Sequence, residues 1–298
     1  MKRSTSRTSM LYTMGFLFCL IAAFAVFFLG VKIGADKAEA QYAQKNPNSV
    51  SHDPNALYQE SDLVTFYHSV FSPYREFKRE WNDKVDRLAS GSASPSQTLS
   101  SLRKLADETS SQVTETALFA NSPLLEQGQL NILKSLRLFS EAADKATSAG
   151  SAATAKELRT GELAQGAVKY GLTGQNNYYS AMLSWGAASS SSIPSEIGNP
   201  KVISFAEWKK MPLLLKNANI AQILLNRGIF ADYDPQDVTA KIDSLVNTGS
   251  TDSLNLTNVQ GAITLLVSTG ALSEQEFSKW RLQYYAKETL PQLPFFFD

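Results

Sequence analysis

The feature that most constrains this chain is a long uncharged segment near its beginning. No charged residue lies between Thr8 and Val31, a run of 24 residues. A helix of this length extends about 36 Å, which exceeds a bilayer hydrocarbon thickness of about 30 Å. Cleavable signal peptides have shorter apolar regions, of about 7–15 residues. The sequence therefore predicts a transmembrane anchor over residues 10–33, in contact with membrane lipid.

Two further observations bear on cleavage and orientation. Ala38-Glu39-Ala40 fits the small-x-small rule of signal peptidase, so cleavage after Ala40 is the alternative to a retained anchor. The basic residues that flank the span slightly favour a cytoplasmic N-terminus. The only cysteine, Cys19, lies inside the span, and exported bacterial domains often avoid cysteine. We expect a single-pass protein of the cell membrane, with residues 1–9 cytoplasmic and the soluble part extracytoplasmic.

The charge balance argues against one class of partner. Four basic residues (Lys2, Arg3, Arg7 and Lys32) and no acidic residue precede Ala35, so the remaining chain has 24 Lys and Arg against 28 Asp and Glu, a net charge of −4. A mildly acidic domain binds phosphates poorly. Nucleic acid is therefore not an expected partner.

The clearest helical pattern lies between residues 63 and 88. Apolar residues recur there at spacings of mostly three and four, which places them on one helix face. Pro73 lies inside the run, yet the pattern keeps its phase across it, so we expect one kinked helix. The face consists of Leu63, Tyr67, Val70, Tyr74, Phe77, Trp81, Val85 and Leu88. Core packing is the favoured role of this face, and a partner-binding seam through Tyr67, Tyr74, Phe77 and Trp81 is the alternative.

Cap residues followed by proline predict the next helices. Ser94-Pro95 and Ser122-Pro123 begin the second and third, and apolar residues on two sides place the third near the middle of a bundle. A fourth helix is predicted from about Ala152, although its glycines lower helix stability by up to about 1 kcal/mol each. The resulting fold class is all-α: a stalk over 34–53, a helical bundle over 54–188 and a linker over 189–203.

The remaining residues predict a smaller helical region over 204–290, followed by an apolar tail over 291–298. Three capping boxes begin at Ser204, Thr257 and Ser273. Glycines mark helix ends, and Asp234-Pro235 marks another start. The tail "LPQLPFFFD" carries three phenylalanines, which we expect to dock on this region, with a partner groove or the membrane surface as the alternative.

The residue types show no catalytic constellation. His52 and His68 are the only histidines, and they lie far apart. "ADYDPQDVTAKID" (231–243) places acids at several calcium-loop positions but lacks the required glycine, so Asp234 is expected to cap a helix instead. Ser101-x-x-Lys104 lacks the companion motifs of penicillin-interacting enzymes. We predict no catalytic residue, no metal site, no cofactor and no enzymatic activity.

One segment has the composition of a ligand site. "KYGLTGQNNYYSAMLSW" (169–185) combines aromatic rings with amides, which suit the apolar faces and hydroxyls of sugar rings. Ordinary packing on the bundle is the alternative. The candidate contacts for a glycan such as peptidoglycan, or for another ligand, are Tyr170, Asn176, Asn177, Tyr178, Tyr179 and Trp185.

The layout, in topology and composition only, resembles single-pass envelope proteins of Gram-positive bacteria. We therefore expect a non-catalytic interaction or assembly module with a protein partner in a bacterial cell envelope. The alternative is a glycan- or ligand-binding sensor ectodomain that works with a partner subunit, and an envelope enzyme is a third, less favoured class. A nine-residue cytoplasmic tail is too short for an output domain of its own.

Overall fold

The computed structural model describes residues 58–116, 119, 122–146, 150–198 and 202–297. Within these residues the regular structure is entirely helical, which confirms the all-α class for this part of the chain. The described residues belong to one compact unit, His52–Asp298. The predicted cytoplasmic tail, anchor and stalk lie outside the described residues. No described helix has both the length and the apolar character that a membrane crossing requires.

The first segment is helical without interruption from Glu60 to Ala89. It consists of α2 (Glu60–Phe66), the π-helical turn η1 (Tyr67–Phe71) and α3 (Ser72–Ala89). All eight residues of the predicted apolar face are buried, and they join the main hydrophobic core. The favoured role of this face, core packing, is therefore what the structure shows.

The expected distortion at Pro73 takes the form of the π-helical turn. Ser72 N–H donates to the carbonyl of Tyr67, five residues back, immediately before the proline that has no N–H to donate. Phe66 and Phe71 are buried as well, in addition to Tyr67 and Val70. The buried face is consequently broader here than the single line of residues that the sequence predicts.

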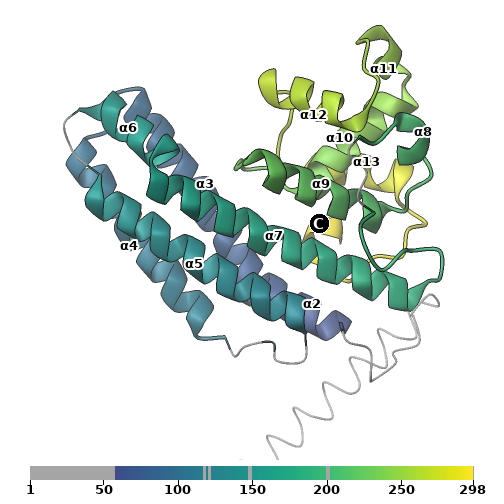
Figure 1. Cartoon of the computed structure of the whole chain (residues 1–298), viewed down its shortest axis with the longest axis horizontal. Helices are drawn as coiled ribbons and strands as arrows, with labels where there is room; N and C mark the ends of the chain where they lie inside the picture. The colour runs from purple at the N-terminus through teal and green to yellow at the C-terminus, as the bar shows by residue number, and fades with distance from the viewer. Residues whose placement is uncertain (1–57, 117–118, 120–121, 147–149, 199–201, 298) are drawn as a thin grey trace, which may run out of the picture. The chain divides into compact units, whose positions relative to one another are not determined.

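Four more helices complete the bundle: α4 (Pro95–Thr114), α5 (Pro123–Lys145), α6 (Ser151–Thr160) and α7 (Glu162–Ser189). Both predicted starts, at Pro95 and Pro123, are confirmed. Helix α5 contacts α4 on one side and α7 on the other, as expected for a central helix (Figure 1). Its Leu130, however, is 40% exposed, so the burial from two directions is incomplete.

The fourth helix, predicted from about Ala152, is confirmed, because α6 begins at Ser151. Helix α7 follows it and is the longest helix among the described residues, with 28 residues. Its glycines allow close approach of neighbouring helices. A Cβ atom at Gly171 would lie 1.9 Å from Tyr74 Oη, and one at Gly174 would lie 2.8 Å from Ile132 Cγ1. A Cβ at Gly186 would lie 2.5 Å from Leu214 Cδ1. Tertiary packing therefore outweighs the low helix propensity of these residues.

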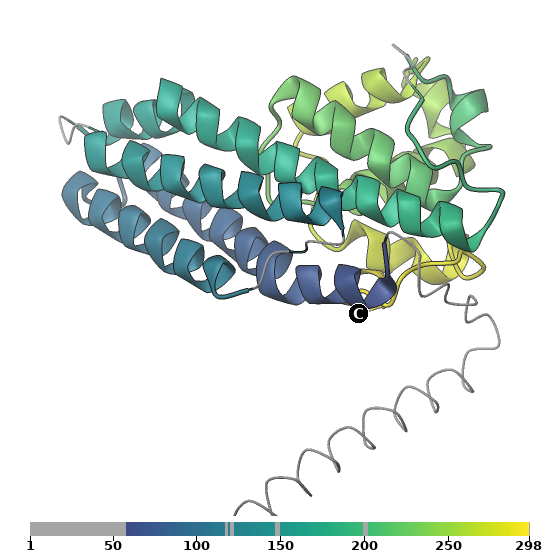
Figure 2. The same ribbon diagram turned by 60° about the horizontal axis from the view of Figure 1, so that its bottom comes forward.

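The second helical region comprises α8 (Phe205–Trp208), α9 (Leu213–Arg227), α10 (Pro235–Asn247), α11 (Ser250–Ser253) and α12 (Val259–Ser268). Helix α9 runs beside α7, and both views show this pairing (Figures 1 and 2). Leu213, Leu214 and Ala218 of α9 belong to the same core as the bundle residues. A smaller cluster around Trp208, Ile220 and Val238 lies within the region itself.

The helix ends test the predicted caps individually. The capping box at Ser204 and Glu207 is confirmed, and Gly228, Gly249 and Gly270 all have positive φ at helix ends. The box predicted at Thr257 was wrong by one residue, because Asn258 is the N-cap of α12. The third was also wrong, because α13 (Glu276–Tyr284) begins at Glu276 itself.

Helix α10 lies inside the second region and buries polar residues as well as apolar ones. Its Asp243 accepts hydrogen bonds from Trp208 Nε1 at 2.7 Å, Lys216 Nζ at 2.8 Å and Tyr285 OH at 2.7 Å. A buried carboxylate requires such compensation, since its loss of hydration is costly. Asp243 thereby ties α10 to α8, to α9 and to the end of α13.

The apolar tail docks on both parts of the compact unit. Its short helix α14 (Pro294–Phe297) carries Phe296, which is fully buried against Phe277 of α13. Phe295 contacts the rings of Tyr67 and Phe71 in the first segment. The predicted docking is confirmed, and it extends beyond the second region to the π-helical turn.

Candidate functional site

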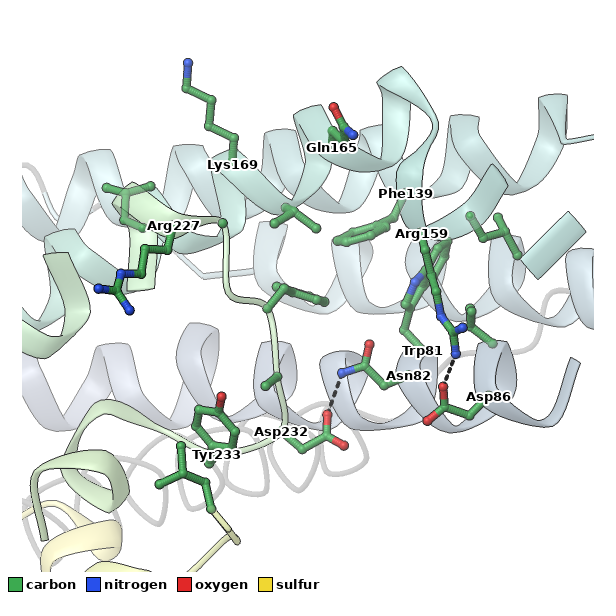
Figure 3. A pocket seen from close by; sticks show the side chains of 18 of the residues that line it. Trp81, Asn82, Asp86, Phe139, Arg159, Gln165, Lys169, Arg227, Asp232 and Tyr233 are labelled. Carbon is green, nitrogen blue, oxygen red and sulfur yellow. Dashed lines mark hydrogen bonds and ion pairs between the residues drawn. The ribbon is translucent and has the colours of Figure 1, made fainter. Parts of the chain in front are cut away.

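A cleft of about 1310 Å³ lies between the bundle and the second helical region. One wall is formed by α3, α6 and α7, and the other by the end of α9, the loop that follows it and the segment before α13. Figure 3 shows the labelled side chains around this cleft. Known small-molecule pockets are typically about 300–1,000 Å³, so this cleft is larger than a single small ligand needs.

The floor of the cleft is apolar. Trp81 and Phe139 are in contact with a ring-centroid distance of 4.4 Å, and Phe230 lies 5.4 Å from Phe139. Trp81 is 3% exposed and Phe139 is 1% exposed. These two rings therefore offer an apolar base to the cleft, but little free face on which another ring could stack.

The position of Phe230 follows from the end of α9. Gly228 adopts φ 64°, a left-handed conformation that suits glycine, and its N–H bonds to the last carbonyls of α9. The chain then leaves the helix axis and crosses toward α3. This turn places Phe230 beside Phe139, and it places Asp232 beside Asn82, which precedes it by 150 positions.

Acidic groups line one edge of the cleft. Asn82 Nδ2 donates to Asp232 Oδ1 at 2.6 Å, and Arg159 pairs with Asp86 (Figure 3). Burial, and then the neighbouring Asp232 carboxylate, raise the pKa of the Tyr233 phenol. Asn82 Oδ1 and the second oxygen of Asp232 accept no hydrogen bond within the described residues.

Cationic and amide groups line the opposite edge. Lys169 and Gln165 project from α7 on the other side of the cleft from the two acids (Figure 3). Arg227 donates to Thr264 Oγ1 and to the carbonyl of Gln260, which are both uncharged. Lys169 Nζ has no acidic partner among the described residues. Because Arg159 neutralises Asp86, the charges without an ionic partner among the described residues include the acid Asp232 on one edge and the cation Lys169 on the other.

A buried cluster of ion pairs next to the cleft fixes the position of the loop that carries Asp232. Asp234, which is fully buried, forms ion pairs with Arg75 Nε at 2.6 Å and Lys78 Nζ at 3.5 Å. The pairs join the start of α10 to α3. The neighbouring Asp232 is thereby held in place against Asn82, because only one residue separates it from Asp234.

Asp237 extends this cluster to α13. Its carboxylate accepts hydrogen bonds from the N–H of Asp234 and of Phe277, each at 3.1 Å. Burial and then the charge of Asp234 raise the pKa of Asp237 to about 7, although these hydrogen bonds and Arg75 act in the opposite direction. The pair Asp234 and Asp237 also forms the cap of α10 that the sequence predicts in place of a calcium loop.

Most of the predicted glycan contacts lie in the core. Tyr178, Tyr179 and Trp185 are buried, Tyr178 OH donates to the carbonyl of Leu63, and Tyr179 OH donates to Gln236 Oε1. The structure therefore does not bring these three rings to a surface, and the packing alternative describes their environment. Binding of a glycan itself stays a prediction.

The other three members of that group lie at different places. Asn176 Nδ2 donates to Gln222 of α9, whereas Asn131 Nδ2 donates to Asn177 Oδ1. Tyr170 is 39% exposed, and Lys134 Nζ lies 5.5 Å from the centre of its ring. The six side chains are thus divided between the core, two helix interfaces and one exposed position.

The alternative partner seam has no exposed face. Tyr67, Tyr74, Phe77 and Trp81 are all buried, and Tyr74 OH is within 2.7 Å of Ser135 Oγ in the bundle. Only Trp81 also contributes to the cleft.

Sequence reasoning missed the polar residues of the cleft, notably Asn82, Lys169 and Asp232. They come from three elements that are distant in the chain, and each has an ordinary local context. The one available signal was the combination of Gly228 with the aromatic and acidic loop "IFADYD" (229–234), which marks a turn away from the helix. The described residues contain no group of three His, Cys, Asp or Glu side chains that could hold a metal ion.

No protein-family model matches this chain, and no curated protein or solved structure is significantly similar to it.

Proposed function

We propose that this chain is a membrane-anchored, non-catalytic binding protein of a bacterial cell envelope, and that it holds its partner in the cleft. The observation that carries the proposal is the cleft itself, which combines an apolar floor with opposite charges on two edges. Binding sites are typically concave and mostly apolar, with a few polar groups that fix orientation.

The location is the second part of the proposal. The uncharged run of residues 8–31 anchors the chain in the membrane, residues 1–9 are cytoplasmic, and the compact unit is extracytoplasmic. Resistance of the full-length chain to alkaline extraction from membranes, together with cleavage of the compact unit by protease added to intact spheroplasts, is the expected result. A chain that begins at Gln41 and is free in the medium would refute the anchor.

The cleft can be tested in intact cells with a photo-crosslinking amino acid. At Gln165, which is exposed on α7 and lines the cleft, we expect specific crosslinked products that mass spectrometry can identify. Lys104 provides the matched control, because it is exposed on α4, on the side of the bundle away from α9 (Figures 1 and 2). Identical or absent products at the two positions would refute binding in the cleft.

A second candidate is a sensor that binds a glycan, and the planar polar side chains of the cleft favour it. Asn82, Gln165 and Asn226 offer both donors and acceptors, which sugar hydroxyls can use. Sedimentation of the purified protein with insoluble peptidoglycan would support this candidate over the first.

A further inference from the structure

We infer that the occupant of the cleft is an extended segment of a partner protein that carries a basic side chain for the acidic edge and an acidic side chain for the basic edge. This inference rests on the proposed function, since it names the partner of the same cleft. Size, floor, amides and charge each contribute to it.

The size and floor of the cleft favour a chain over a sugar. About 1310 Å³ is more than a single small molecule fills, whereas an extended peptide of several residues can occupy it. Trp81 and Phe139 are almost fully buried, so they cannot provide the open ring faces that would stack on a sugar. Together with Val85 and Leu158, they form the buried floor of the cleft, and the partly buried ring of Phe230 presents apolar surface to a side chain.

The amides on the walls match a peptide backbone. Asn82 uses its Nδ2 on Asp232 and leaves Oδ1 as an acceptor. Asn226 uses its Oδ1 on Gln222 and leaves Nδ2 as a donor. Gln165 of α7 is exposed on the same wall as Asn82, whereas Asn226 at the end of α9 lies on the other wall. A backbone in extended conformation presents both an N–H and a C=O at each residue, so it can pair with such groups from both walls.

The charges then specify which side chains accompany that backbone. Asp232 has only an uncharged partner, Asn82, and Glu274 has no cationic partner among the described residues. Across the cleft, Lys169 has no anionic partner within the same part of the chain, and Arg227 contacts only neutral groups. A segment with a Lys or Arg near Asp232 and an Asp or Glu near Lys169 complements both edges.

Three blocked synthetic heptapeptides test this inference on the full-length protein in nanodiscs. All share a central Phe flanked by Gly and Ser. The first has Lys near one end and Glu near the other, the second has the same residues in reversed order, and the third has Gln at both places. We expect one of the two charged orders to bind about tenfold more tightly than the neutral peptide, and to weaken as salt is raised.

Variants assign each charge to an edge. Asp232→Asn should weaken binding of the better charged peptide about three- to fivefold and leave binding of the neutral peptide unchanged. Lys169→Gln should weaken binding of the same charged peptide by a similar factor, because it removes the cation that pairs with the acidic end of the peptide. Asp252→Asn is the matched control, because Asp252 is exposed on α11 and does not line the cleft. Asparagine at position 232 can still accept a hydrogen bond from Asn82, so the loop is expected to keep its place.

The outcomes separate this inference from the proposed function. Equal binding of all three peptides, or no binding at all, overturns the inference about the partner segment. If a chitin-derived oligosaccharide binds tightly and the peptides do not, the inference is overturned and the occupant of the cleft is a glycan. Crosslinking at Gln165 in cells does not depend on the outcome of the peptide or oligosaccharide experiments. If no specific crosslink forms there, the cleft is refuted as a binding site.

Discussion

Replacing Gly171 with alanine should destabilise the protein, although alanine is the better helix former. Gly171 is buried in α7, and a Cβ atom there would lie 1.9 Å from Tyr74 Oη and 2.9 Å from Ser135 Oγ. These two hydroxyl oxygens are 2.7 Å apart, and Ser135 also donates to the carbonyl of Ala167 at 2.7 Å. The added methyl group must therefore displace Tyr74 and break its hydrogen bond.

The opposing effects can be compared in magnitude. Overpacking costs about 1–3 kcal/mol, and a lost buried hydrogen bond costs about 1 kcal/mol more. The gain in helix propensity is about 1 kcal/mol. The net effect is a decrease in the free energy of unfolding of about 1–3 kcal/mol, which lowers the melting temperature of a unit of this size by roughly 2–12 °C.

Gly166→Ala is a matched control in the same helix. A Cβ atom there would meet only Leu138 Cδ1, at 3.3 Å, and this flexible side chain can move. The propensity gain then dominates, so stability should rise by about 0.5–1 kcal/mol.

The assay is urea unfolding of the detergent-solubilised full-length chain, followed by tryptophan fluorescence. Tyr74→Phe removes the hydroxyl that the new methyl group would contact. We therefore expect Gly171→Ala to cost at least about 1 kcal/mol less in the Tyr74→Phe background than in the wild type. The reasoning is wrong if Gly171→Ala and Gly166→Ala change stability by the same amount, or if the Tyr74→Phe background makes no difference.

Three more predictions concern other buried groups. Because burial raises the pKa of Asp237 to about 7 from its ordinary 3.8, the folded state favours the protonated acid, and the stability this gives is lost as pH rises between these values. Relative to Asp237→Asn, the wild type should therefore become less stable as pH rises from 4 to 8 in urea titrations, and a constant difference would contradict the assigned pKa. Lys216→Met should lower the free energy of unfolding by about 3 kcal/mol, because it leaves Asp243 buried without its cation. A loss below about 0.5 kcal/mol in the same assay would show that the hydrogen bonds from Trp208 and Tyr285 are enough to stabilise the buried carboxylate. Phe296→Ala should cost about 3–5 kcal/mol by calorimetry, since the ring is fully buried, and an unchanged melting temperature would mean that the tail does not dock.

Local patterns in the sequence predicted much of the fold. The apolar face from Leu63 to Leu88, the proline starts of α4, α5 and α10 and the glycine ends all depend on neighbouring residues, so a single sequence can reveal them. The length and stability of α7 could not be predicted from local patterns. Its glycines are unfavourable locally, and the reason for them, contact with Tyr74, Ile132 and Leu214, exists only in the folded state.

The candidate site depends on such distant contacts throughout. Asn82 and Asp232 are 150 residues apart, and although Gly228 and the loop 229–234 mark a turn, no local pattern shows that Asp232 meets Asn82. The aromatic and amide composition of residues 169–185 was visible, but composition does not show direction. Tyr178 and Tyr179 point into the core, whereas Lys169 lies at the exposed rim of the cleft, and this difference is set by the way α7 packs between α5 and α9.

The contacts between the first helical segment and the later residues affect what happens when the backbone is cut. Phe295 packs on Tyr67, Gln292 N–H donates to Glu60, and Asp234 pairs with Arg75, so both halves of the compact unit supply parts of one interior. A single nick by protease in the loop between α7 and α8 should therefore leave two fragments that stay associated and migrate together until denaturant is added. Either fragment made alone would expose the apolar surface that the other covers, and would be expected to precipitate.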